Sequence, residues 1–379
     1  MKEKIDSVDG VRGVACLMVL LSHLSLIFFP YVYTGRISEQ HSQVEYYIYH
    51  SPFAFFYSGT AAVFIFFVLS GYILSFACCR NGDILNNCLK MTMSRYPRLM
   101  LPTLGSVLLC YFVMIATPDG FNTLSWIGGV LDVKGHDLPG AIYNGLVSAV
   151  LFCDRSYNII IWTMQVEFFG SLIVFCMTPL IVKVKYKEVV LFTGALLMIC
   201  ISPDKIGASY ACFLIGSAIY HAEIKPSKLT GYLALIAGLY FAGFHNKSNS
   251  YSIIYELMSF KAPGGRSNPY YLSNMISGVL IVFAVVKSGV AQCTVTNRVS
   301  LYLGKVSYSA YLIQIPVFYV MTQVGFDLFK SLGLSYEYSA IFTSLVTISS
   351  VYMISTLFYI YVDKKSIKIS KLSHKLIAA

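Results

Sequence analysis

An apolar stretch near the N-terminus, DSVDGVRGVACLMVLLSHL from Asp6 to Leu24, carries Asp9 and Arg12 near its start and His23 deep inside it. Arg12 and His23 are separated by eleven positions, or three helical turns plus about 20°, so a helix places them on one face about 16 Å apart. Asp9 precedes Arg12 by one turn, a spacing that permits an ion pair. An ionisable side chain inside a membrane helix is costly and indicates a functional site. The alternative is a histidine hydrogen-bonded within a helix bundle.

Two further motifs carry charge beside apolar segments. Ser94–Leu99 (SRYPRL) is predicted to lie in the cytoplasmic loop before the third span. In it two arginines, Arg95 and Arg98, bracket a proline that restricts the backbone. Guanidinium groups bind phosphate bidentately, although an ordinary basic cytoplasmic loop would look the same. In Ile161–Ser171 (IWTMQVEFFGS) Glu167 lies inside an apolar span, where a carboxylate must pair or line a polar cavity. Trp162 has the position of an aromatic anchor at the outer interface.

Weaker signals complete the set. Ser70 and its glycine neighbour lie in an apolar segment, where small residues favour close helix packing. Tyr308 and Gln314 are polar positions in the apolar segment that begins LGKVSYSAYLIQ. Asp363 stands beside two lysines at the end of the last apolar segment, which is typical of an interface anchor.

The elements that position these residues are membrane helices. Of the 379 residues 56% are hydrophobic and only 12% are charged, against about 25% charged in a soluble domain, and the mean hydropathy is +0.67. The net charge of +10 is scattered, so it does not indicate nucleic-acid binding. The ten cysteines form neither a disulfide framework nor a zinc-site spacing, and no metal is predicted.

The pattern predicts an all-α integral membrane protein with about ten transmembrane helices, both termini cytoplasmic, as one domain over 1–379 with no appended soluble domain. No small-residue cleavage site closes the first span, which is expected to be retained. Of the 28 basic residues, 19 fall in predicted inside segments and 8 outside, as the positive-inside rule requires. The ten predicted spans are 11–30, 53–78, 101–117, 158–182, 188–203, 206–222, 229–245, 272–288, 306–326 and 337–362. The longest outside loop, 118–157, contains several turn signals, and a loop of that length often covers a cavity.

The ordered motifs together resemble the acyltransferase 3 family of ten-helix membrane acyltransferases. They are D-G-x-R-G with Arg-x10-His, S-G-Y, R-x-x-R, W-T-x-x-x-E and L-G-x-x-S-Y-x-x-Y-L, and they extend from Asp6 to about Asp363. Two positions depart from the family pattern. Gln314 stands where the family often has histidine, so no proton-transfer role is assigned to it, and Asp363 lacks the proline of the family's late Glu-x-Pro signature.

The resemblance implies an O-acyltransferase that moves an acyl group, usually acetyl from acetyl-CoA, to a sugar hydroxyl. Arg12, His23, Arg95 and Arg98 match the residues that the family needs for activity. Arg95 and Arg98 are expected to bind the phosphates of the donor, with Arg12 helping to position it, and His23 to act as general base or to form an acyl-histidine. Glu167 is expected to orient His23 or bind the acceptor. Asp9, Ser70, Tyr308 and Trp162 are supporting residues: Asp9 is expected to hold Arg12, and Ser70 and Tyr308 to donate hydrogen bonds.

The acceptor class stays open at this point. O-antigen, exopolysaccharide, peptidoglycan or an antibiotic sugar would fit, and the absence of a fused hydrolase-like domain favours lipopolysaccharide O-antigen or a related glycan in a bacterial inner membrane. The expected partners are this glycan or lipid-linked sugar, acetyl-CoA and membrane lipid, with no nucleic acid; the sequence does not indicate an oligomeric state. A transporter, flippase or polymerase of a lipid-linked glycan is the alternative, but it would not need the Arg-x10-His and R-x-x-R pair.

Overall fold

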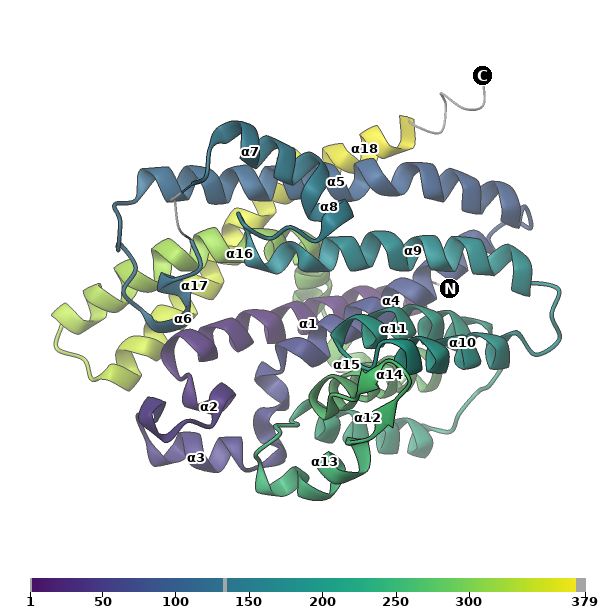
Figure 1. The fold of residues 1–379 in the computed structure, drawn as a ribbon, viewed down its shortest axis with the longest axis horizontal. Helices are drawn as coiled ribbons and strands as arrows, with labels where there is room; N and C mark the ends of the chain where they lie inside the picture. Colours follow the sequence, from purple (N-terminus) through teal and green to yellow (C-terminus); the bar gives the residue numbers. More distant parts are fainter. Residues whose placement is uncertain (1, 132–134, 373–379) are drawn as a thin grey trace. The chain divides into compact units, whose positions relative to one another are not determined.

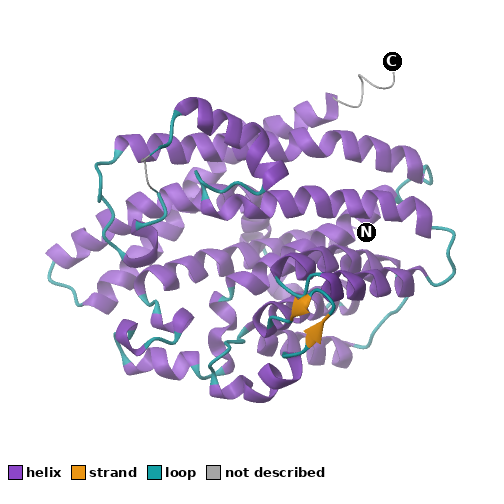
Figure 2. Cartoon of the chain, viewed as in Figure 1, coloured by secondary structure: helices purple, strands orange, loops and turns teal. Residues whose placement is uncertain are grey.

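A computed structural model describes residues 2–131 and 135–372 of the chain. Helices dominate the described residues, as expected for the all-α class, and a small hairpin of two two-residue strands is the exception (Figures 1 and 2). The helices that contain long apolar runs are α1 (Lys2–Phe28), α4 (Gly59–Cys78), α5 (Ile84–Ala116), α9 (Trp162–Ile181), α10 (Lys187–Ile201), α11 (Lys205–His221), α12 (Lys228–Ala242), α14 (Pro269–Ser288), α16 (Arg298–Ser331) and α17 (Tyr336–Phe358). The shorter elements are α2 (Tyr31–Thr34), α3 (Gln43–Tyr49), α6 (Ser125–Gly128), α7 (Leu138–Tyr143), α8 (Ala149–Phe152), α13 (Ser252–Met258), β1 (Lys261–Ala262), β2 (Gly265–Arg266), α15 (Gln292–Val295) and α18 (Lys364–Leu372).

Each of the ten predicted spans falls on a helix, but among the described residues only seven helices are long and apolar enough to cross a membrane. The other three are α10, α11 and α12, with 15, 17 and 15 residues. A helix of 15 residues extends only about 22 Å, less than the roughly 30 Å of hydrocarbon. The chain is therefore a multi-pass helical membrane protein, and the count of ten stays a prediction.

The chain divides into two compact units, and the first comprises Met1–Ser22, Tyr31–Thr92 and Phe169–Lys305. In it α4 packs against α11 and α14, while α10 packs on α11 and α12 on α14. Close approach of α4 and α11 depends on glycine: a Cβ at Gly71 would lie 2.1 Å from the Phe213 carbonyl oxygen. The S-G-Y motif thus packs helices, as predicted.

A second crossing in this unit explains the glycines of two other motifs. A Cβ at Gly13 would lie 2.4 Å from the Ser300 carbonyl oxygen, and one at Gly304 would lie 1.9 Å from the Asp9 carbonyl oxygen. The start of α1 therefore crosses the start of α16 with the two backbones in contact. The D-G-x-R-G and L-G motifs form one helix crossing, although they are far apart in the sequence.

The second unit comprises His23–Pro30, Met93–Phe168 and Val306–Ala379. It contains α6, α7, α8, α17 and α18, together with parts of α1, α5, α9 and α16. Helix α1 is continuous, so Arg12 and His23 do share one helix. His23 lies only five residues, or about 7 Å, before the helix ends at Phe28. The predicted end of this span, residue 30, is two residues beyond the observed end of the helix.

Candidate active site

The imidazole of His23 is held at one edge by Gln314. Its Nδ1 lies 2.8 Å from Oε1 of Gln314, whose side chain is fully buried on α16. The amide of Gln314 is itself oriented, since its Nε2 donates to the Tyr311 carbonyl at 2.9 Å. Oε1 must then face the histidine and can only accept, so Nδ1 carries the proton of the neutral ring. Nε2 is left with its lone pair, which is the form that a general base requires.

Aromatic side chains pack against the same ring. The indole of Trp126 stacks on His23 with 5.1 Å between ring centroids and 18° between planes, and Phe318 meets it edge-on at 6.5 Å. His23 nevertheless keeps part of its surface exposed. Within residues 2–131 and 135–372, its Nε2 has no hydrogen-bond partner. The orientation of the ring is thus fixed, and Nε2 is available to accept a proton.

Trp126 is held over His23 by the segment that leads into α6. Asn122 donates to the Tyr319 carbonyl at 2.7 Å, and the Thr123 N–H donates to Oε1 of Gln323 at 2.9 Å. Both partners lie on α16, within three turns of the hydrogen-bond partner of His23. Hydrogen bonds to the same helix therefore hold both the histidine and the segment that carries the tryptophan.

A buried polar cluster connects the loop that precedes α9 to α16. Nδ2 of Asn158 donates to Oγ of Ser106 at 2.8 Å and to the Leu312 carbonyl at 3.1 Å. The Tyr311 hydroxyl donates to the Ile160 carbonyl at 3.0 Å. All of these groups are buried, where an unpaired polar group would cost about 1–3 kcal/mol. The loop that precedes α9 is consequently fixed to the turn of α16 that orients the histidine.

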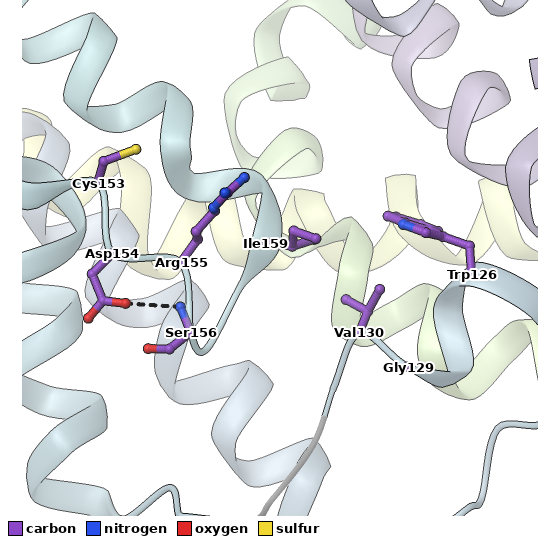
Figure 3. A pocket seen from close by; sticks show the side chains of 8 residues that line it. All are labelled: Trp126, Gly129, Val130, Cys153, Asp154, Arg155, Ser156 and Ile159. Atoms are coloured by element: carbon purple, nitrogen blue, oxygen red, sulfur yellow. Dashed lines mark hydrogen bonds between the residues drawn. The ribbon is translucent and has the colours of Figure 1, made fainter. Parts of the chain in front are cut away.

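Between these two segments lies a pocket of about 630 Å³ (Figure 3). Trp126 and Val130 reach into it from one wall, and the segment after α8 forms the other. Its lining residues are Trp126, Gly129, Val130, Cys153, Asp154, Arg155, Ser156 and Ile159. Cys153 has φ +58°, in the left-handed region that few residues other than glycine adopt, so the chain turns sharply where the pocket-lining residues begin.

Asp154 is the carboxylate of this pocket. Its Oδ2 accepts from Oγ of Ser148 at 2.9 Å and its Oδ1 from the Ser156 N–H at 3.1 Å. Partial burial acts to raise the pKa of Asp154, but the hydrogen bonds from Ser156, Ser148 and Asn144 outweigh it and lower that pKa below the ordinary 3.8. The group is ionised at neutral pH.

The R-x-x-R motif lies inside α5 rather than in a loop, which corrects the prediction for Ser94–Leu99. A proline within a helix costs about 3 kcal/mol, yet the helix continues through Pro97. Each arginine is anchored by a carboxylate. Nη2 of Arg95 donates to Oε2 of Glu167 at 2.6 Å, with both side chains mostly buried.

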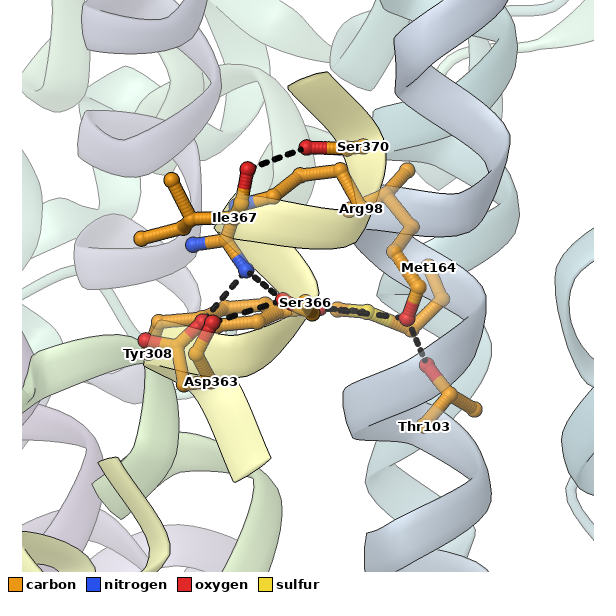
Figure 4. A network of polar contacts seen from close by, with 9 residues as sticks. Arg98, Thr103, Met164, Tyr308, Asp363, Ser366, Ile367 and Ser370 are labelled. Atoms are coloured by element: carbon orange, nitrogen blue, oxygen red, sulfur yellow. Dashed lines mark hydrogen bonds and ion pairs between the residues drawn. The ribbon is translucent and has the colours of Figure 1, made fainter. Parts of the chain in front are cut away.

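Arg98 is the centre of a second polar cluster, shown in Figure 4. Its Nη1 pairs with Oδ1 of Asp363 and also donates to Oγ of Ser366 at 2.8 Å. The guanidinium lies 5.2 Å from the centre of the Tyr308 ring, a cation–π contact. Asp363 is only 3% exposed, so it is the buried partner of Arg98 and not the expected interface anchor.

The other predicted residues have the following surroundings. Asp9 and Arg12 do not form the expected ion pair, since the ion pairs of the described residues involve other groups. Glu167 pairs with Arg95, and in the described chain the hydrogen-bond partner of His23 is Gln314, which corrects the expectation that Glu167 orients the histidine.

The supporting residues are divided between the two units. Tyr308 belongs to the Arg98 cluster, where its hydroxyl lies 3.5 Å from the Leu99 carbonyl oxygen and from the Met164 sulfur. Trp162 is half-buried at the start of α9, and its carbonyl faces Sγ of Cys153. Ser70 is half-buried on α4 in the first unit.

Two residues beside His23 were not identified from the sequence. Gln314 was noted only as a departure from the family pattern, although an amide side chain within an apolar segment was a detectable signal. Trp126 was not singled out, although the chain has only two tryptophans and this one lies in the long outside loop.

Comparison with known proteins found a family match over most of the chain. The acyltransferase-domain family profile matches residues 5–362. The O-acetyltransferase PaAT-1 from Phomopsis amygdali is 22% identical over 442 aligned positions, covering 97% of this chain and 84% of that protein. No solved structure matches the chain.

Proposed function

Starting from the fact that the chain belongs to the acyltransferase 3 family and is a membrane O-acyltransferase, we propose that it transfers acetyl from acetyl-CoA to a sugar hydroxyl. The acceptor is a cell-surface or lipid-linked glycan, with lipopolysaccharide O-antigen or exopolysaccharide as the favoured class. The observation that carries this proposal is the Gln314–His23 pair, which leaves Nε2 of the imidazole as an oriented base.

His23 takes the proton of the acceptor hydroxyl on Nε2 as the hydroxyl oxygen attacks the carbonyl carbon of the thioester. The tetrahedral intermediate collapses, the C–S bond breaks, and the proton held by Nε2 passes to the departing thiolate. The imidazolium is stabilised because Oε1 of Gln314 accepts from Nδ1–H in both protonation states. General base catalysis of this kind contributes about 10²–10⁴ in rate.

Arg95 and Arg98 are proposed to bind the phosphates of the donor. A guanidinium carries five N–H donors, so pairing with one carboxylate oxygen fixes its direction and uses few of them. The pairs with Glu167 and Asp363 would thus pre-orient two cations one helical turn apart on α5. Arg12 keeps the role that the family resemblance gives it, as a residue that positions the donor.

The proposed topology has ten spans and both termini in the cytoplasm of a bacterial inner membrane. This arrangement puts the R-x-x-R motif on the side of acetyl-CoA and residues 118–157 on the outer side. In this topology His23, five residues before the end of α1, lies toward the outer side.

The test is O-acetylation of a defined O-antigen in a bacterial host, read by proton NMR for wild type and His23→Ala. O-acetyl signals that vanish in a normally inserted His23→Ala variant support the proposal. His41→Ala, which changes an exposed histidine, is the matched control and should retain the signals. Signals that persist in His23→Ala would overturn the role of the base. If wild type forms no O-acetyl group on any tested glycan and hydrolyses no acetyl-CoA, the transferase proposal fails and the transporter or polymerase alternative gains support.

A further inference from the structure

The pocket of Figure 3 has no role in the steps above, yet it adjoins the proposed base. Trp126 belongs to both: its indole lines the pocket and also stacks on the His23 ring at 5.1 Å. Both walls are tied to α16, one through Asn122 and the other through Asn158. A ligand in this pocket would therefore contact the indole that stacks on the imidazole, between walls held in fixed positions.

The lining is amphipathic in a way that suits one class of ligand. The pocket volume of about 630 Å³ falls within the 300–1,000 Å³ of typical small-molecule sites. An indole offers an electron-rich surface to weakly positive C–H groups. The ionised Asp154 accepts hydrogen bonds, the Arg155 guanidinium donates them, and Val130 and Ile159 add apolar surface. A pyranose presents C–H groups together with hydroxyls that both donate and accept.

The charged groups of the pocket suit a neutral, hydroxyl-rich ligand. Arg155 is exposed and forms no ion pair among the described residues, and Asp154 immediately precedes it and is ionised. A hydroxyl-rich ring can donate hydrogen bonds to the carboxylate and accept them from the guanidinium.

We infer that this pocket is the acceptor subsite, where a sugar ring packs against Trp126 while its hydroxyls bond to Asp154 and Arg155. The inference rests on the proposed function for the identity of the ligand as acceptor. Asp154 keeps acceptor capacity for this task, because a carboxylate has about four lone-pair sites and the side-chain oxygens accept from Ser148 and the Ser156 N–H. These two bonds also aim the carboxylate.

The experiment measures binding without turnover. In a Trp162→Phe background Trp126 is the sole tryptophan, so its emission reports on the pocket directly. The purified full chain in detergent is titrated with methyl pyranosides of glucose, galactose, mannose and rhamnose, with no acyl donor present. A saturable change with at least one of them is expected. Arg155→Gln should weaken that binding about tenfold, since it removes the charged hydrogen-bond donor of the pocket.

Asp154→Asn should weaken binding to a similar degree, but this variant also disturbs a loop contact, so Arg155→Gln is the decisive variant. Asp119→Asn is the matched control, because this exposed aspartate lies in the same long loop and not in the pocket. Absence of any saturable change, or equal binding by Arg155→Gln and Asp119→Asn, would overturn the inference.

The two proposals fail separately. Pyranoside binding that depends on Arg155, in a protein that transfers no acetyl group, would keep the subsite and reject the transferase. Acetyl transfer whose acceptor dependence is unchanged in Arg155→Gln would keep the transferase and reject the subsite.

Discussion

Replacing Gln314 by leucine tests whether the tautomer of His23 matters. Leucine has a similar volume and leaves the packing around a fully buried position nearly intact. It removes the acceptor at 2.8 Å from Nδ1, so neither tautomer of the neutral ring is favoured by a partner. The fraction of histidine with a free lone pair on Nε2 should fall, as should the stability of the imidazolium.

The magnitude follows from the lost hydrogen bond. A net contribution of about 1 kcal/mol corresponds to about a fivefold change in an equilibrium. A second loss of similar size is expected in the transition state, where Nδ1–H belongs to a cation and its hydrogen bond is stronger. Together these effects predict a decrease in kcat of about 10–30-fold, with little change in KM for either substrate.

The assay is acetyl transfer by purified protein, with Gln314→Glu as the matched variant. Glutamate retains an acceptor oxygen at the same reach, so it should keep more activity than leucine. An ionised glutamate would also stabilise the imidazolium, so the rise of activity with pH should move to higher pH in Gln314→Glu. If Gln314→Leu is folded and kcat is within twofold of wild type, the argument from the amide orientation is refuted.

Three other predictions concern packing, an ion pair and pH. Gly13→Val should prevent the crossing of α1 with α16 and reduce folded protein on size-exclusion chromatography, whereas Gly129→Ala, which meets no atom within 4 Å, should not. A double-mutant cycle of Arg95→Ala and Glu167→Ala, read by unfolding in detergent, should give a coupling of roughly 1–3 kcal/mol, and no coupling would contradict the buried pair. Because the pKa of Asp154 is lowered in the folded protein, its ionised carboxylate stabilises the folded loop at pH values above the ordinary pKa of 3.8. This contribution is lost as the pH falls through the lowered pKa. In the Trp162→Phe background, Trp126 emission should therefore hold steady from pH 8 to 5 and change below about pH 4, and the change should be smaller when Asp154→Asn is added.

The sequence predicted the helical elements well because a continuous apolar run in a membrane leaves the backbone few alternatives to a helix. All ten predicted spans fall on helices, and the observed bounds of α10 and α12 differ from the predicted ones by one to three residues. Hydropathy does not record the exact residue at which a helix ends.

The partners of the charged residues were less predictable. Asp9 and Arg12 have ideal spacing for a local pair, yet spacing allows a contact without requiring it. The arginines of α5 find carboxylates 72 and 265 residues away, and no periodicity links positions so distant. Gln314 was judged by what the family often has at that position. Its actual contribution comes from an amide whose direction is fixed by the Tyr311 carbonyl, which only three-dimensional geometry reveals.

The central claim is that His23 is the base of an acetyl transfer, and its most direct test uses membranes that contain equal amounts of inserted wild type and His23→Ala. Radiolabelled acetyl-CoA is supplied with the acceptor glycan identified by NMR, and label on the glycan is counted. The account predicts that His23→Ala transfers at least about 10²-fold less label than wild type. Equal transfer by the two proteins would contradict it.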